Sequence, residues 1–206
     1  MNVIDRLVES GAIAIVRTQD QQSGQLVSDA IVDAGLTCIE VTLTSPGALE
    51  IIASFASRSG VCVGVGTVLK PLDVSRARKA GATFVVSPNT NPEVIAATKR
   101  EGLVSIPGVA TASDVAIALD AGADVLKLFP AASYGPAHLK ALRDPFPSNL
   151  WCPTGGLTVA SIPEWFAAGA TMVGLGGPLL KGGVEAVAAN VSTFMTAIAA
   201  VERPKS

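Results

Sequence analysis

The sequence predicts a (β/α)8 TIM barrel in a single domain, residues 1–206, with a short helix before the first strand. Eight short apolar runs with the character of buried strands recur along the chain, and their starts lie roughly 20 to 26 residues apart, the spacing of compact βα units. Alanine-rich segments with helical spacing separate these runs, which favours a parallel sheet surrounded by helices. An open, doubly wound parallel sheet is the alternative arrangement of the same units.

Residues 2–10 are predicted to form a helix that covers the floor of the barrel. Residues 184–201 are mostly apolar but include Glu185 and Asn190, which predicts a packed amphipathic helix. Residues 202–206 are expected to be frayed. The eight predicted strands lie at residues 12–16, 38–43, 61–65, 84–86, 103–106, 125–128, 150–152 and 172–175.

Four of the predicted helices end in an Ala-Gly pair. Glycine just after a helix permits the left-handed C-terminal cap from which the chain turns into the next strand. These glycines are Gly35, Gly81, Gly122 and Gly169.

The composition is that of a compact globular protein, with 49% hydrophobic and 16% charged residues. A net charge of −2 gives no support for binding nucleic acid, so we expect no nucleic-acid partner. No stretch of 18 apolar residues occurs and the N-terminal residues do not form a signal peptide, so we expect a cytoplasmic protein with no membrane partner.

In barrels of this kind the chemistry lies where strands end and βα loops begin. Lys127 is the most informative residue there, because it sits inside the apolar run 125–128. A bare ammonium group is costly to bury, whereas a neutral amine in apolar surroundings can attack a carbonyl carbon. A lysine at a strand end can also extend its amine to water, and this reading stays open for the residue taken alone.

Glu40 is the second distinctive residue, flanked by Ile39 and Val41 in a strand that the barrel buries. If Glu40 and Lys127 both point into the barrel mouth, they supply a general acid/base and an amine nucleophile to one pocket. A structural ion pair between the two side chains is the alternative.

Two glycine pairs follow the seventh and eighth predicted strands, Gly155-Gly156 and Gly176-Gly177. Barrels often bind phosphate in these two loops through backbone N–H groups. The pairs therefore favour a phosphate site, although tight turns also use glycine.

Metal and triad chemistry find no support in the sequence. His138 is the only histidine, interpreted as a surface helix residue, and no G-x-S-x-G motif occurs. The three cysteines, Cys38, Cys62 and Cys152, are scattered along the chain and are expected to be buried and reduced. We therefore expect no metal and no cofactor.

Six sequence motifs, in this order, resemble the class I 2-keto-3-deoxy-6-phosphogluconate (KDPG) aldolases and their 6-phosphogalactonate (KDPGal) relatives over nearly the whole chain. The motifs are Ile39-Glu40-Val41-Thr42-Leu43, Val65-Gly66-Thr67-Val68-Leu69, Ser87-Pro88, Ile106-Pro107-Gly108, Leu126-Lys127-Leu128-Phe129-Pro130-Ala131 and Cys152-Pro153-Thr154-Gly155-Gly156.

The resemblance implies a barrel that is commonly a homotrimer, needs no metal, and acts as an aldehyde-lyase on a small keto sugar-acid phosphate. It implies a Schiff-base role for Lys127 and a proton-transfer role for Glu40. The implied substrate-binding residues are Arg17, Thr67, Pro88, Thr154, Gly155, Gly156, Gly176 and Gly177.

Three departures keep the preferred C4 epimer open. Thr44 stands where the gluconate branch has arginine, and the run Thr44-Ser45-Pro46 resembles the galactonate branch. Thr154, in contrast, is a gluconate-type feature. Gly177 stands where both branches often carry a serine, which removes a hydroxyl donor for phosphate. A phosphate-binding barrel with epimerase or synthase chemistry and a non-catalytic sugar-phosphate sensor are the alternative functions.

Overall fold

The structure, a computed structural model, describes residues 1–202, so all but the first residue of the segment predicted to be frayed lies outside the described residues. The strands are β1 (Ala12–Val16), β2 (Cys38–Thr42), β3 (Cys62–Gly66), β4 (Phe84–Val86), β5 (Val104–Ile106), β6 (Gly108–Val109), β7 (Val125–Leu128), β8 (Leu150–Trp151) and β9 (Val173–Leu175). The helices are α1 (Val3–Ser10), α2 (Gln21–Asp33), α3 (Ala48–Ala56), α4 (Pro71–Lys79), α5 (Pro92–Arg100), α6 (Ala112–Asp120), α7 (Ala131–Tyr134), α8 (Pro136–Arg143), α9 (Ile162–Ala167), α10 (Gly177–Leu180) and α11 (Val184–Ala199), with a 3-10 turn at Val159–Ser161.

The strands form a curled parallel sheet in two hydrogen-bonded parts. The larger part has six strands in the order β5-β4-β3-β2-β1-β9, and the smaller has three in the order β6-β7-β8. All registered pairs are parallel, so the predicted alternation of strands and helices is confirmed. The prediction of one continuous eight-stranded sheet is not met, because hydrogen bonding divides the strands into these two parts.

The division has a physical cause at Pro107, which separates β5 from β6 and carries no backbone N–H to continue a ladder. Individual bonds still connect the two parts. The N–H of Asp124 donates to the carbonyl of Ser105 (3.0 Å) and the N–H of Lys127 donates to the carbonyl of Pro107 (2.9 Å). Beyond β8, Thr154 forms an isolated parallel bridge to Gly174 of β9. The two parts of the sheet therefore approach each other at both junctions.

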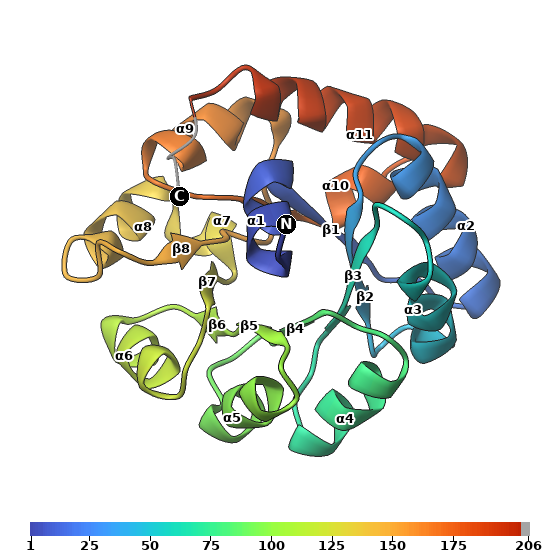
Figure 1. Ribbon diagram of the computed structural model, residues 1–206. Helices are drawn as coiled ribbons and strands as arrows, with labels where there is room; N and C mark the ends of the chain where they lie inside the picture. Colours follow the sequence, from blue (N-terminus) through green and yellow to red (C-terminus); the bar gives the residue numbers. More distant parts are fainter. Residues whose placement is uncertain (203–206) are drawn as a thin grey trace.

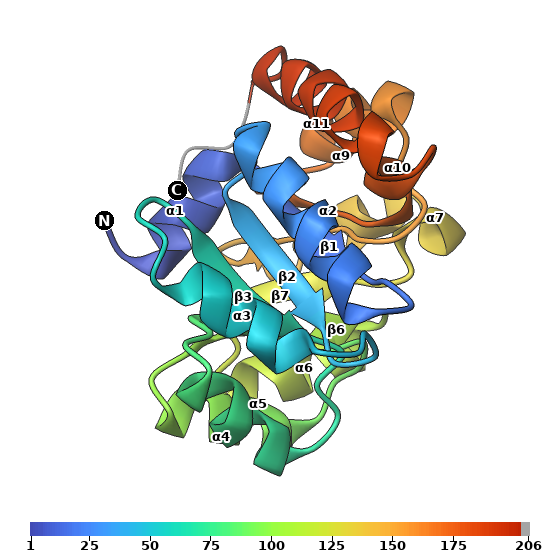
Figure 2. The same cartoon turned by 90° about the vertical axis from the view of Figure 1, so that its right-hand side faces the viewer.

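The longer helices form a ring around the strands, and α1 lies at the centre of that ring when the molecule is viewed along its axis (Figure 1). In the side view α1 sits at one end of β1, β2 and β3, whereas α7 and α10 sit at the opposite end (Figure 2). Helix α1 contacts these same three strands. The predicted floor helix is thus confirmed, and the carboxyl ends of the strands open away from it.

Both faces of the sheet are buried, and two apolar clusters occupy them. The outer cluster joins strand residues such as Ile39 and Val41 to helix residues such as Ile31 and Ile51. The inner cluster consists of Leu7, Ile13, Cys38, Cys62, Phe84, Val86, Ile106, Val125, Cys152 and Met172. Because side chains alternate between the two faces of a strand, β1, β2, β3, β4 and β7 each contribute to both clusters.

The predicted helix-ending glycines are confirmed as left-handed. Gly35, Gly81, Gly122 and Gly169 have φ angles of 96°, 95°, 96° and 98°. A residue with a Cβ rarely adopts this backbone conformation, so glycine is required where these helices turn into the next strand.

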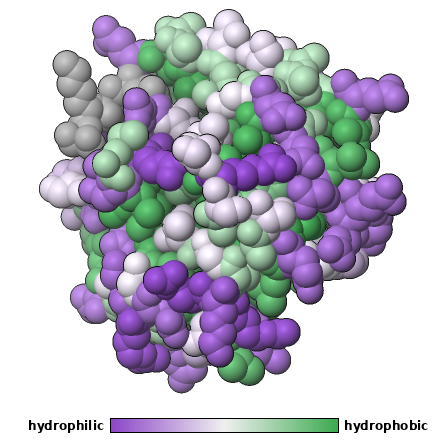
Figure 3. Space-filling view, turned by 45° about the vertical axis from the view of Figure 1, so that its right-hand side comes forward, coloured by the Kyte–Doolittle hydropathy of each residue, from purple (hydrophilic) through white to green (hydrophobic). Residues whose placement is uncertain are grey.

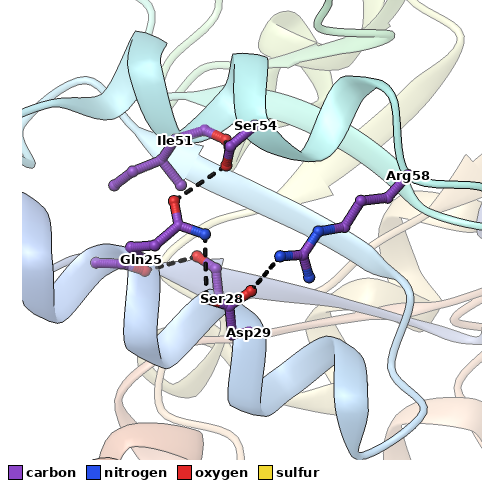
Figure 4. Close-up of polar contacts among 7 residues, drawn as sticks. Gln25, Ser28, Asp29, Ile51, Ser54 and Arg58 are labelled. Atoms are coloured by element: carbon purple, nitrogen blue, oxygen red, sulfur yellow. Dashed lines mark hydrogen bonds and ion pairs between the residues drawn. The ribbon is translucent and has the colours of Figure 1, made fainter.

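Helices α2 and α3 are joined by polar contacts on their outer side (Figure 4). Arg58 donates to Asp29 at 2.5 Å, and Ser54 donates to the side-chain oxygen of Gln25 at 3.0 Å. The amide of Gln25 donates in turn to Asp29 at 3.1 Å. Gly24 allows the close approach of the two helices, since a Cβ at this position would lie 2.6 Å from Ile51. These contacts hold the first two helices of the ring, whose preceding loops reach the carboxyl ends of β1 and β2.

Hydrophilic and apolar residues alternate over the face shown in Figure 3. Hydrophilic residues predominate at the bottom of this view, where α4 and α5 lie in Figures 1 and 2. Within residues 1–202, no helix combines the length and the apolar character that crossing a bilayer requires.

Candidate active site

A cavity of about 340 Å³ opens at the carboxyl ends of the strands. All ten residues that the sequence analysis selected line it, although they come from seven segments far apart in the chain. They are Arg17, Glu40, Thr67, Pro88, Lys127, Thr154, Gly155, Gly156, Gly176 and Gly177. The cavity is therefore the candidate active site.

Lys127 and Glu40 reach the cavity because of their place in the strand alternation. Each lies two residues after a member of the inner cluster, Val125 on β7 and Cys38 on β2. Two residues along a strand return a side chain to the same face, so both point into the interior above the apolar floor. Lys127 is 6% exposed and Glu40 is 3% exposed, which excludes the reading in which Lys127 extends to bulk water.

No ion pair forms between these two side chains. The salt bridges among residues 1–202 are Arg58–Asp29, Arg76–Asp73 and Lys99–Asp124, and none of these residues lines the cavity. The alternative of a structural ion pair between Glu40 and Lys127 is therefore wrong. The Lys127 amine faces instead the ring of Phe129, with 5.1 Å between the nitrogen and the ring centroid. Both functional groups are left available to a third molecule in the cavity.

The carboxyl group of Glu40 sits in a space that Gly66 provides. A Cβ at position 66 would lie 1.9 Å from Oε1 of Glu40, which is an impossible contact. Burial raises the pKa of Glu40 above its ordinary value of 4.5, and the positive charges of Lys127 and Arg17 act in the opposite direction. The carboxyl group can thus hold a proton more readily than one in water, as a group that transfers protons must.

Arg17 follows β1 and stands at the exposed rim of the cavity. Its Nη2 donates to the hydroxyl of Thr67 at 3.5 Å, a long contact that leaves other guanidinium donors for a ligand. Thr67 has φ of +59°, in the left-handed region that side chains with branched Cβ atoms rarely enter. Such strain is retained where the surrounding structure needs the side chain in that place, which here is the wall of the cavity.

Pro88 is held against the neighbouring strand by a close backbone approach. A Cβ at Gly108 would lie 2.3 Å from the carbonyl oxygen of Pro88, so only glycine fits there. The hydroxyl of Ser87 donates to the carbonyl of Val68 at 2.8 Å and that of Thr90 to the carbonyl of Gly108 at 2.7 Å. These bonds fix the β4–α5 loop and with it the proline that lines the cavity.

The glycine loops follow β8 and β9, and β9 pairs with β1. Thr154 is buried, and Gly174 leaves room for it, since a Cβ at 174 would lie 2.2 Å from its hydroxyl oxygen. Gly155 and Gly156 have φ angles of 98° and 76°, which other residues rarely adopt. Gly177 begins α10 and faces open space, with no atom within 4 Å of where a Cβ would stand.

Sequence reasoning missed the apolar part of the lining. Phe129 could have been found, because it lies two residues after Lys127 and so continues the same face. The others give no signal that distinguishes them from core residues. They are Ile15, Leu157, Leu175, Pro178 and Leu180.

His138 and the cysteines lie outside the cavity. His138 is half-buried, in contrast to the predicted surface position, because its Nε2 bonds the carbonyl of Ala110 at 2.7 Å and its ring stacks on Tyr134. The cysteines are free and buried as predicted, but all three meet in the inner cluster instead of being scattered in space. Residues 1–202 contain no group of three potential metal ligands.

Comparison with known proteins identifies the family. Residues 3–193 match the family model described as KDPG and KHG aldolase. The chain belongs to the KDPG and KHG aldolase family. It is 35% identical to the 2-dehydro-3-deoxy-6-phosphogalactonate aldolase of Escherichia coli K12, with 90% of this chain and 93% of the relative covered. It is 38% identical to the 2-dehydro-3-deoxy-phosphogluconate aldolase of Pseudomonas aeruginosa, with 80% and 76% covered.

A solved member of the family shares the fold, and its structure contains a covalent intermediate. The KDPG aldolase of Legionella pneumophila, crystallised with pyruvate captured as a covalent carbinolamine, superposes with a TM-score of 0.82. The two proteins are 28% identical, and the match covers 98% of each chain. In this relative, pyruvate is bound covalently as a carbinolamine, and a carbinolamine is the intermediate that precedes a Schiff base.

Proposed function

We propose that this protein is a class I aldolase that cleaves 2-keto-3-deoxy-6-phosphogalactonate or its gluconate epimer to pyruvate and glyceraldehyde 3-phosphate. The observation that carries the proposal is the pair Lys127 and Glu40, both buried, both lining one cavity, and not paired with each other. An amine and a carboxyl group in that arrangement can form an imine and move the protons of its reactions. The family of the chain supports the same chemistry.

The reaction begins with the Lys127 amine. Its lone pair attacks the C2 ketone of the substrate, and loss of water from the resulting carbinolamine gives an iminium ion. Water leaves with the ketone oxygen, and the positive iminium nitrogen then accepts electrons from the neighbouring carbon framework.

Glu40 then moves protons. Its carboxylate removes the proton of the C4 hydroxyl, the C3–C4 electron pair passes into the iminium, and glyceraldehyde 3-phosphate leaves as the enamine forms. The proton now held by Glu40 returns to C3, and hydrolysis of the imine releases pyruvate and the free amine. General acid–base help of this kind contributes about 10²–10⁴-fold in rate.

The cavity walls suit the two ends of such a substrate. Arg17 offers parallel N–H donors to the carboxylate of the keto acid, and Thr67 beside it adds a hydroxyl. Pro88 packs against the pyruvate part. The 6-phosphate is assigned to the part of the lining formed by Thr154 and the two glycine loops, where Gly155, Gly156, Gly176 and Gly177 offer backbone N–H groups.

Borohydride reduction in the presence of pyruvate tests the covalent step. Pyruvate should become fixed to Lys127, and peptide mass spectrometry should find the adduct on that residue. Lys127→Ala should abolish labelling, whereas Lys140→Ala, which changes an exposed lysine on α8, should not. An adduct on Lys70 or Lys140 in the native protein would refute the assignment.

A retro-aldol assay with both C4 epimers, phosphorylated and unphosphorylated, tests the substrate. Identity to the galactonate and gluconate relatives is nearly equal, so it does not choose between the epimers. Release of pyruvate from at least one phosphorylated epimer is expected. Epimerisation without pyruvate release would replace the proposal by the second enzyme class named above.

We further propose that the two parts of the sheet act as one (β/α)8 barrel and that the chain is a single domain. The bonds across Pro107 and the bridge between Thr154 and Gly174 support this, because they link the two parts at both junctions. A cytoplasmic location is supported by three free buried cysteines. A homotrimer is proposed from the family resemblance, and sedimentation should give about three times the chain mass of 20.8 kDa.

A further inference from the structure

Arg17 is exposed at the rim of the cavity, and its side-chain hydrogen bond to Thr67 is long. Its position therefore depends on contacts of the neighbouring backbone. The backbone on each side of Arg17 is bonded to a hydroxyl group from a different element. On one side the Thr42 hydroxyl donates to the carbonyl of Val16 at 3.2 Å. On the other side the N–H of Thr18 donates to the hydroxyl of Ser45 at 3.1 Å.

These two hydroxyls are bonded to each other, with 3.2 Å between their oxygens. Each hydroxyl has a single proton, so the direction of every bond follows. The carbonyl of Val16 can only accept, and therefore takes the proton of Thr42. The bond between the hydroxyls must then be donated by Ser45, which also accepts from the N–H of Thr18.

The result is one directed chain of hydrogen bonds that begins at Thr18, passes through Ser45 and Thr42, and ends at Val16. It encloses Arg17 between its two ends. Thr42 is fully buried and Ser45 is 3% exposed, so water does not compete for these bonds. Thr44 adds a contact of 3.1 Å to the Thr42 hydroxyl, whose second lone pair is free to accept it.

We propose that Thr42 and Ser45 are positioning residues that fix the backbone of Arg17 and thereby aim its guanidinium at the substrate carboxylate. The proposal rests on the proposed function of Arg17 as the carboxylate-binding residue. Neither hydroxyl needs to touch the substrate, since neither residue lines the cavity. Loss of either should weaken substrate binding and leave the covalent chemistry at Lys127 intact.

The test compares steady-state kinetics of Thr42→Val and Ser45→Ala with the native protein. Each variant should raise KM for the keto sugar acid about tenfold, while kcat stays within about twofold, because a buried group loses its partner without loss of the reacting groups. Thr42→Ser keeps the hydroxyl and should restore the native KM. Thr98→Val is the matched control, because Thr98 is a buried threonine of α5 whose hydroxyl also bonds a backbone carbonyl.

The same substitutions are then made in an Arg17→Ala background. If Thr42 and Ser45 act through Arg17, they should not raise KM further once the guanidinium is gone. An equal increase of KM in both backgrounds, an equal effect of Thr98→Val, or no rescue by Thr42→Ser would overturn the proposal. Should Thr42→Val not fold, Ser45→Ala decides, because it keeps the bond from Thr42 to Val16.

Pyruvate trapping on Lys127 separates this proposal from the proposed function. Native protein that traps no pyruvate and cleaves no keto acid would show that the function is wrong. Trapping and cleavage with an unchanged KM in both hydroxyl variants would show that the positioning role is wrong.

Discussion

The two ends of the sheet interior differ although the same strands build both. At the end covered by α1, the interior holds the apolar inner cluster, sealed by Leu7. At the other end, two residues further along the same strands, it holds Lys127, Glu40 and Thr154 around an open cavity. Polar groups whose burial costs free energy are thus concentrated at one end, while buried apolar side chains at the floor stabilise the fold. The comparison predicts that substitutions at the rim change chemistry and those at the floor change stability.

The largest effect is expected at the rim. Lys127→Ala should lower kcat/KM for pyruvate release by at least about a thousandfold, because no other amine lining the cavity can form the imine. The thermal midpoint should stay near that of the native protein. Lys140→Ala serves as the control, and a loss of activity there equal to that of Lys127→Ala would contradict the assignment.

At the floor, Leu7→Ala should lower the free energy of unfolding by about 3 kcal/mol, because it removes a fully buried side chain and leaves a cavity. Urea denaturation measures the change, and kcat/KM of the folded protein should remain within about twofold. Leu72→Ala is the matched control, since Leu72 is 71% exposed and should change stability by less than about 0.5 kcal/mol. A folded Leu7 variant with greatly reduced turnover would contradict the prediction that floor residues affect stability and not chemistry.

Glu40→Gln should lower the rate of carbon–carbon cleavage by about a hundredfold while pyruvate trapping on Lys127 persists. In the native protein, kcat/KM should fall on the acid side with a midpoint above pH 4.5, because burial raises the pKa of Glu40. A pH profile of the residual activity of the variant should lack this acid limb. Unchanged turnover would remove Glu40 from the mechanism.

The same carboxyl group should cost stability as the pH rises. The unfolded chain loses this proton near pH 4.5, but the folded protein retains it to higher pH, so folding is penalised increasingly through that window. Glu40→Gln should therefore raise the melting temperature above that of the native protein, by about 2–4 °C for each kcal/mol gained in the free energy of unfolding. The gain should grow with pH. Melting curves across this range test it. Glu93→Gln, which changes an exposed carboxyl on α5, is the control, and equal gains in both variants would argue against burial as the cause.

The smallest effect is expected at Gly177. Gly177→Ser should fold normally, because the position faces open space and its φ is not positive. The added hydroxyl can donate to the 6-phosphate, so KM for the phosphorylated substrate should fall about fivefold, equivalent to about 1 kcal/mol. KM for the unphosphorylated epimer should not change. An equal change for both substrates would locate the phosphate elsewhere.

The strands could be predicted from sequence because parallel strands buried on both faces appear as short apolar runs. For the same reason the sequence could not say which residues face the interior, since Cys38 and Ile39 are equally suitable for either side. The interruption at Pro107 was visible as a proline, but its effect on the continuity of the sheet depends on the neighbouring strands.

The polar residues of the site could be predicted because their chemistry stands out at strand ends. Ile15 and Leu180 could not, since an apolar residue that lines a cavity resembles one that fills a core. The hydroxyl chain of Thr42 and Ser45 could not be predicted either. Its bonds depend on how the β2–α3 loop folds back toward Thr18, which local sequence does not specify.

The room that Gly66 leaves for Glu40 has a consequence for engineering. Any substitution at 66 installs a side chain where the carboxylate now rests, so it should mimic the loss of the acid even though the fold survives. A library that samples this codon to reshape substrate preference would return inactive clones for that reason alone. Pairing Gly66→Ala with the shorter Glu40→Asp offers a route around the collision, and makes the two codons a unit that should be varied together.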